Sequence, residues 1–171
     1  MKKYLLVLFV CAFSAIITVS AQSKLKIGHI DSQELLSAMP ASDTAQRKLE
    51  KIAKEHELVL EEMTVEFNKK LDEYSRKVDT MSDLARATKE AELEDMQRRI
   101  QTFQETAQQD IQKKRVELFQ PVQEAALKAV NEVAEEHGFT YILDMGMGAV
   151  VYASPDSEDI LLLVKEKLGI E

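Results

Sequence analysis

The sequence predicts an α+β chain that is predominantly helical, with a long antiparallel helical hairpin projecting from a small β-sheet body. The first observation is that residues 41–120 contain no glycine or proline and are rich in Glu, Lys, Gln, Arg, Leu and Ala, which favour helix. The second is that apolar residues recur there every three or four positions, which indicates helices with one narrow apolar stripe. The third is that the candidate strands lie near the two ends of the chain, and a hairpin brings such ends together.

Residues 1–21 have the features of a cleavable secretory signal peptide. Lys2 and Lys3 form a basic start, residues 4–19 are almost wholly apolar, and the small residues before Gln22 suit a signal peptidase. The alternative is a retained membrane anchor, but this apolar run is shorter than the roughly 20 residues that a spanning helix needs. We therefore expect a mature chain that starts at Gln22 and is exported across the inner membrane.

Cysteine and charge content exclude several classes of function. Cys11 is the only cysteine, so the mature chain has no disulfide and no cysteine metal ligand. Residues 41–120 hold 15 basic and 18 acidic residues in a fine mixture, whereas the rest of the mature chain holds 5 basic and 12 acidic residues. A nucleic-acid binder shows a basic face, and this distribution offers none, so we expect no nucleic-acid partner.

The first part of the body is expected within residues 22–40. Residues 24–31 predict a short strand with Leu25, Ile27 and His29 on one face. Residues 32–39 predict a short helix, capped by Asp31 or Ser32 and ended by Pro40.

Residues 41–120 form the predicted arm, and Ser42 or Asp43 is expected near its start. Its apolar stripe follows coiled-coil steps of three and four with small irregularities. The members of the stripe are Leu49, Ile52, His56, Val59, Met63, Phe67, Leu71, Tyr74, Val78, Met81, Ala85, Leu93, Met96, Ile100, Phe103, Ala107 and Ile111.

The arm is expected to turn near residues 79–83. Ser82 can cap a second helix, with Asp83 in its favourable first turn. A turn there makes two helices of similar length, residues 41–79 and 83–120, so that Pro40 and Pro121 meet at the base. A single straight rod would instead hold the candidate strands far apart, each with an unpaired edge.

The second part of the body is expected over residues 121–171. After Pro121, which we interpret as a kink and candidate hinge, the helix turns apolar and stops at His137-Gly138. Residues 139–145 and 149–153 predict two strands joined by a glycine-bearing turn, and a last helix is expected to start within residues 154–157. Such a small body has a thin core, so we expect the chain to oligomerise.

No constellation of residues supports catalysis, and we predict neither an enzyme nor a cofactor or metal site. His56 lies on the arm stripe without a second ligand one turn away, so it is interpreted as a structural residue. His137 is expected at a helix end. Asp31 and Asp144 end two strands and could form an acid–base pair, although helix capping and turn formation are the favoured interpretation.

The order of these elements resembles the periplasmic Skp/OmpH chaperone family over essentially the whole mature chain. The matching strings are I-G-H-I-D (27–31), Y-I-L-D (141–144), V-V-Y-A (150–153) and S-E-D-I (157–160), with the helical hairpin between the first two. The resemblance implies a homotrimer whose body is a small β-barrel built from three chains, with helical arms around a cavity. It further implies a periplasmic holdase that needs no ATP and keeps unfolded outer-membrane β-barrel proteins from aggregating.

Five arm residues are candidates for contact with such clients: Phe67, Tyr74, Met81, Met96 and Phe103. They lie on the stripe, so the default is packing in the seam between the two arm helices, with client contact for any that reach the inner face. The family's better-known members are basic whereas this chain is acidic, and its charge does not support contact with a membrane surface or lipopolysaccharide. The alternative function is a structural coiled-coil scaffold or spacer of the envelope.

Overall fold

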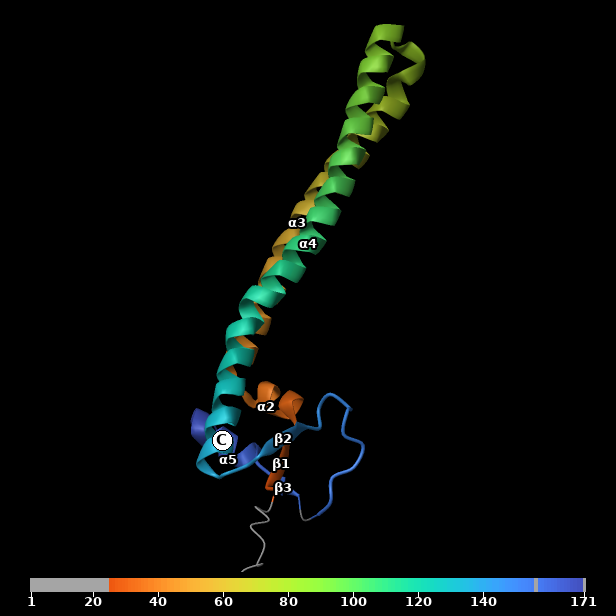
Figure 1. Ribbon diagram of the computed structural model, residues 1–171. Helices are drawn as coiled ribbons and strands as arrows, with labels where there is room; N and C mark the ends of the chain where they lie inside the picture. Colours follow the sequence, from red (N-terminus) through yellow and green to blue (C-terminus); the bar gives the residue numbers. More distant parts are fainter. Residues whose placement is uncertain (1–24, 156, 171) are drawn as a thin grey trace, which may run out of the picture.

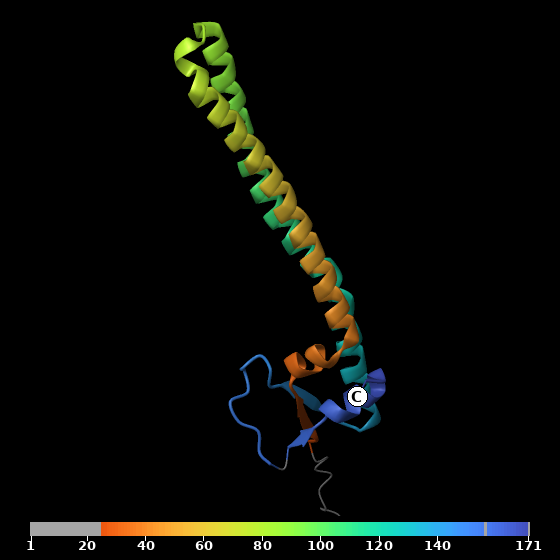
Figure 2. The same ribbon diagram turned by 180° about the vertical axis from the view of Figure 1, so that it is seen from behind.

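A computed structural model describes residues 25–155 and 157–170, so the predicted signal peptide lies outside the described residues. The chain forms a small body and a long two-helix arm (Figure 1). The arm consists of α3 (Pro40–Lys77), the short 3₁₀ helix η1 (Val78–Thr80) and the first part of α4 (Asp83–Glu136). Both views show α3 and α4 side by side over the length of the arm (Figure 2).

The arm begins with a proline. Helix α2 (Ser32–Ala38) is capped by Asp31, whose Oδ1 accepts hydrogen bonds from the backbone N–H groups of Gln33 and Glu34. Pro40 then occupies the first turn of α3, where its missing N–H costs no helical hydrogen bond. Ser42 and Asp43, which were expected near the start of the arm, lie in this first turn.

The turn at the far end of the arm follows the capping signal in the sequence. Residues 78–80 tighten into a 3₁₀ turn, and the Ser82 side chain accepts a hydrogen bond from the Ala85 N–H at 3.3 Å. Helix α4 then continues through Pro121 without interruption as far as Glu136. It ends at His137, and Gly138 adopts a left-handed φ of 69°, which glycine accepts without strain.

The sheet has three parallel strands in the order β2-β1-β3. They are β1 (Ile27–Ile30), β2 (Tyr141–Asp144) and β3 (Glu158–Asp159). β1 lies in the middle with Ile27 opposite Tyr141 and Gly28 opposite Glu158. Parallel pairing of β1 and β2 is expected because a long helical connection separates them in the sequence.

The predicted hairpin of residues 139–145 and 149–153 is wrong. Only residues 141–144 form a strand, and residues 149–153 belong to a loop that projects from the body (Figure 1). Both edges of β1 are occupied by β2 and β3, so within the described residues only the outer edges of β2 and β3 are left for residues 149–153 to pair with, and they use neither. Gly146 lies close to the α2 cap instead, because a Cβ there would stand 2.6 Å from Asp31 Oδ1.

The last helix starts later than expected. Helix α5 spans Leu161–Leu168, so residues 154–157 do not begin it. The residues before it are used by the sheet, where Glu158 and Asp159 pair with β1 and the Ile160 N–H donates to His29 O at 3.0 Å. The Asp159 side chain then accepts a hydrogen bond from the Leu161 N–H and leads the chain into α5.

One apolar core joins all parts of the body to the base of the arm. Its buried members are Ile30, Leu35, Met39, Ala45, Val122, Ala126, Ala129, Val133, Ile160, Leu161 and Val164. The expectation that α4 is buried beyond Pro121 is confirmed for four of these residues, whereas Leu127 is exposed. Because Met39, Ala45 and Val122 share this core, both ends of the arm are fixed to the body at the same place.

Candidate functional site

The seam of the arm is only partly covered because two helices alone form it. Within the arm, Ala45, Leu49 and Leu93 are buried. All five candidate client-contact residues, Phe67, Tyr74, Met81, Met96 and Phe103, are half-buried. Each is therefore partly covered by its neighbours and also keeps part of its surface accessible. Val59 and Leu71, which were expected in the seam, are exposed.

Polar contacts join the two arm helices between these apolar residues. His56 Nε2 lies 2.9 Å from Asp110 Oδ2, and the His56 ring meets Phe103 edge-on with 6.1 Å between the centroids. Tyr74 Oη donates to Glu90 Oε1 at 2.6 Å. His56 is thus a structural contact of the hairpin, in agreement with the sequence analysis.

A third cross-link lies near the tip of the arm. The ammonium groups of Lys70 on α3 and Lys89 on α4 both donate to the carboxylate of Glu92. Hydrogen bonds from Lys70 and then Lys89 lower the pKa of Glu92 to about 2, because they stabilise the ionised carboxylate. The same contact raises the pKa of Lys70. Glu92 therefore stays ionised and holds α3 against α4 at neutral pH.

Four of the five candidate residues line three hollows in the arm. Met63 and Phe103 line a hollow of about 480 Å³, and Met96 meets Met63 in a small adjoining hollow. Tyr74 and Met81 line another hollow of about 310 Å³ nearer the tip, most of whose other lining residues are charged. The structure thus brings Met96 and Phe103 together around Met63, and Tyr74 and Met81 together at a different level.

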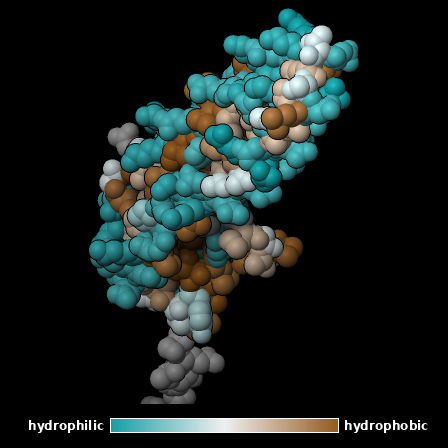
Figure 3. Space-filling model, turned by 90° about the horizontal axis from the view of Figure 1, so that it is seen from above, coloured by the Kyte–Doolittle hydropathy of each residue, from teal (hydrophilic) through white to brown (hydrophobic). Residues whose placement is uncertain are grey.

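Several exposed apolar residues of the arm were missed by the sequence analysis. Leu58, Val65, Leu84 and Val116 are all at least half exposed. They lie outside the apolar stripe, so only the position of each residue around its helix could have identified them as exposed. Seen from above, the arm shows separate apolar patches set in a mostly hydrophilic surface (Figure 3).

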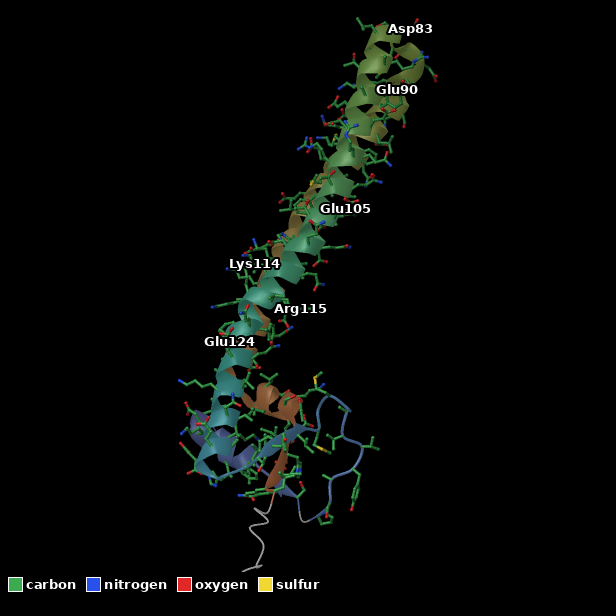
Figure 4. All side chains as sticks on the ribbon, viewed as in Figure 1. Asp83, Glu90, Glu105, Lys114, Arg115 and Glu124 are labelled. Carbon is green, nitrogen blue, oxygen red and sulfur yellow. The ribbon has the colours of Figure 1, made fainter. Side chains whose placement is uncertain are left out.

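Charged side chains of both signs cover the rest of the arm. Along α4, the labelled acidic residues Asp83, Glu90 and Glu105 are followed by the basic residues Lys114 and Arg115 and then by Glu124 (Figure 4). Acidic side chains contact several members of the basic clusters of the arm: Arg98 contacts Asp95 at 2.6 Å, and Lys113 and Lys114 both contact Glu117. No purely basic face results along this part of α4, within the described residues.

The body carries a large apolar groove and an open sheet face. The groove has a volume of about 670 Å³ and lies between α2, α4 and β2. On the sheet, the exposed side chains Leu25, Ile27, Tyr141 and Leu143 stand in one patch, because Ile27 and Tyr141 are opposite each other. The adjacent loop exposes Val151 at 96%. This much uncovered apolar surface marks an interaction site.

Asp31 and Asp144, the carboxylates at the ends of two strands, both accept hydrogen bonds from backbone N–H groups. Asp144 accepts hydrogen bonds from the Ser32 N–H at 3.1 Å, the Ser32 hydroxyl at 2.6 Å and the Gly146 N–H at 2.9 Å. Partial burial acts to raise the pKa of Asp144, but the hydrogen bonds from Ser32 and Gly146 outweigh it and lower that pKa. With Asp31 capping α2, both carboxylates have the roles that the sequence analysis favoured.

Residues 25–155 and 157–170 offer neither a metal site nor a membrane-spanning helix. No group of three or more His, Cys, Asp or Glu side chains there is arranged to hold a metal ion. In the same part of the chain, no helix joins the length of a membrane span to the necessary apolar character.

Comparisons with known proteins agree with this architecture. A search of curated protein sequences found no match. Among solved structures, the fold is similar to that of a candidate OmpH-like outer membrane chaperone from Caulobacter crescentus CB15, with a TM-score of 0.73 and 16% identity over 83% of this chain and 82% of the other. The model of the OmpH-like outer membrane protein family matches residues 26–168. On the strength of that match, the chain belongs to the OmpH-like family.

Proposed function

We propose that this protein is an ATP-independent holdase of the periplasm, which binds unfolded outer-membrane β-barrel proteins between helical arms and keeps them from aggregating. The observation that carries the proposal is the arm, a two-helix projection with a half-covered apolar seam and a surface of mixed charge. The chaperone description of the similar solved structure supports the same role.

The arm suits a client that has no fixed shape. An unfolded outer-membrane strand carries an apolar side chain at every second position and an unpaired backbone edge. Many weak contacts along an arm can hold such a chain, and several arms on one body raise its effective concentration. Methionine and aromatic side chains such as Met63, Met96 and Phe103 adapt to varied apolar partners.

We also propose that the body assembles into a homotrimer. The apolar groove, the open sheet face around Tyr141 and Leu143, and the loop bearing Val151 together make an apolar surface that a second copy can cover. Among the described residues, none pairs with the outer edge of β2, which leaves its backbone groups ready for a neighbour's strand.

An aggregation assay tests the holdase role. A urea-unfolded outer-membrane β-barrel protein is diluted into buffer with an equal amount of the mature chain, without ATP, and light scattering is followed. We expect scattering to be suppressed. Unchanged aggregation in the presence of correctly assembled protein would contradict the holdase and favour the envelope scaffold.

The native mass tests the assembly. We expect three copies for the mature chain and a monomer for Leu143→Asp, which puts a charge on the open sheet face without touching the core. Val65→Asp, on the exposed surface of the arm, is the matched control and should keep the assembled mass. Amino-terminal sequencing of protein from the periplasmic fraction tests export, with Gln22 as the expected first residue.

A further inference from the structure

The middle of the arm contains an open hollow that is large enough to take a side chain. It has a volume of about 480 Å³ and is lined by Met63, Arg98, Arg99, Thr102, Phe103 and Thr106. This volume lies within the range of roughly 300–1,000 Å³ that is typical of ligand pockets. Met63 comes from α3 and the other residues from α4, so the hollow is an opening in the seam between the helices.

Short side chains on α4 account for the opening. Thr102 and Thr106 lie one helical turn apart, on the same side of α4. The Thr106 hydroxyl donates to the Thr102 carbonyl oxygen at 2.8 Å, so its hydrogen-bonding capacity is used within the helix. Larger residues at these positions would fill the hollow.

The apolar lining of the hollow is held in place from the other side of the seam. The Phe103 ring meets the His56 ring at an interplanar angle of 88°, and His56 is fixed by its contact of 2.9 Å with Asp110. A ring fixed before binding loses little conformational freedom when a ligand arrives. Met63 supplies a polarizable sulfur that readily contacts aromatic rings.

The rim of the hollow carries an uncommitted cation. Arg98 forms an ion pair with Asp95 at 2.6 Å. Arg99 is exposed, and its guanidinium has no ion pair with another residue of the part that the structure describes. A guanidinium free of carboxylates can stack on the face of an aromatic ring.

We propose that this hollow binds aromatic side chains of unfolded client strands. A fixed phenyl ring, a methionine sulfur and a free guanidinium each favour an aromatic ligand over an aliphatic one. The inference rests on the proposed holdase function, whose clients carry aromatic girdles at the ends of their strands. It assigns to this part of the arm a preference for aromatic residues, in place of uniform apolar contact.

Two labelled peptides test the preference. Both are 12-residue, alternating apolar–polar strands; one carries tyrosine and phenylalanine at its apolar positions and the other carries leucine. Fluorescence anisotropy with the assembled mature protein gives the Kd of each. We expect tighter binding of the aromatic peptide. Arg99→Gln should weaken binding of the aromatic peptide by roughly two- to fivefold, the size of an exposed cation–π contact, and leave the leucine peptide unchanged.

A second variant fills the hollow directly. Thr102→Trp should weaken binding of the aromatic peptide by at least about tenfold, because a large ring occupies the space that the ligand needs. Val65→Trp is the matched control, since Val65 is exposed on the arm outside this hollow. Circular dichroism establishes that each variant keeps its helices, and Arg99→Gln keeps the test valid if Thr102→Trp disturbs the seam.

The outcomes separate this inference from the proposed function. Equal affinity of the wild-type protein for the two peptides would overturn the aromatic site, and so would unchanged binding of the aromatic peptide by both Arg99→Gln and Thr102→Trp. If the wild-type protein still suppresses aggregation, either of these results leaves the proposed holdase function intact. If the wild-type protein neither suppresses aggregation nor binds either peptide, the holdase and the aromatic site both fail.

Discussion

His56 on α3 and Asp110 on α4 form a polar contact across the arm, with 2.9 Å between Nε2 and Oδ2, although 54 positions separate them in the sequence. Because an ionised carboxylate can only accept, the imidazole Nε2 donates. Both side chains are half-buried, and the contact lies beside the Phe103 ring. It therefore fixes the rotation of one helix relative to the other at the level of the hollow.

A double-mutant cycle should show that this pair stabilises the hairpin. His56→Ala and Asp110→Ala should each lower the free energy of unfolding by about 1 kcal/mol, since each leaves a half-buried partner without its hydrogen bond. The double variant should lose less than the sum, with a coupling of about 0.5 kcal/mol or more. Urea unfolding followed by circular dichroism measures these values, and strict additivity would contradict the assignment.

Stability of the arm should fall in acid because of Glu92. Its pKa is lowered from 4.5 to about 2 in the folded state by Lys70 and Lys89. A carboxylate with a lowered pKa stabilises the fold above its unfolded pKa, and this contribution is lost as pH falls from about 4.5 towards 2. Between about pH 5 and pH 2.5, the Tm of the wild-type protein should therefore fall further than that of Glu92→Gln.

Glu94→Gln is the matched control for that titration. Glu94 is exposed on the same helix and has no ion pair within the described residues. Its substitution should leave the acid-induced fall in Tm as large as in the wild-type protein. If the Tm of Glu92→Gln falls with pH as steeply as the Tm of Glu94→Gln, the contacts of Lys70 and Lys89 with Glu92 do not contribute to stability in solution.

Leu35 should be a key residue of the body core. It is 1% exposed on α2, whereas Leu162 on α5 is 77% exposed. Leu35→Ala should lower the free energy of unfolding by about 2–5 kcal/mol, because it leaves a cavity in a small core. The same substitution at Leu162 removes little buried surface, so thermal or urea unfolding should separate the two variants clearly.

Pro121 should weaken α4 where the arm meets the body. Proline has no N–H, so the carbonyl oxygen of Glu117 lacks its usual helical donor. Pro121→Ala should raise the free energy of unfolding by about 1–3 kcal/mol. It should also slow hydrogen exchange over residues 117–125 and, if the site acts as a hinge, make the arm stiffer in small-angle scattering. Gln123→Ala is the control and should show the hydrogen exchange of the wild-type protein. If Pro121→Ala also shows the wild-type exchange profile, Pro121 does not act as a hinge.

Local signals in the sequence were sufficient for the helices. The tract without glycine or proline predicted α3 and the arm part of α4, although α4 continues through Pro121 to Glu136. The side chain of Ser82 caps α4 where the sequence suggested. These features depend on backbone preferences and nearby side chains, so no tertiary information was needed. The capping role of Asp31 and the helix end at His137 were predictable for the same reason.

The sheet was harder to predict because strand pairing depends on distant partners. The apolar residues 149–153 have the composition of a strand, but a strand exists only where a neighbour supplies hydrogen bonds. The strand that does form, β3, consists of Glu158 and Asp159. Two charged residues have no alternation of apolar and polar side chains, so the sequence pattern could not reveal this strand. The mid-arm hollow was equally hidden, since whether Arg99 and Thr102 line a gap depends on the rotation of both helices.

The shared anchoring of both arm ends has a consequence for how this design can vary. Met39, Ala45 and Val122 fix the start of α3 and the returning part of α4 to the same core. The length of the rest of the arm can therefore change without altering that core. Removing or adding matching heptads in both helices changes the reach by about 10 Å per step. In the proposed trimer, the size of the space between the arms could thus be adjusted by arm length alone, independently of the residues that would assemble the base.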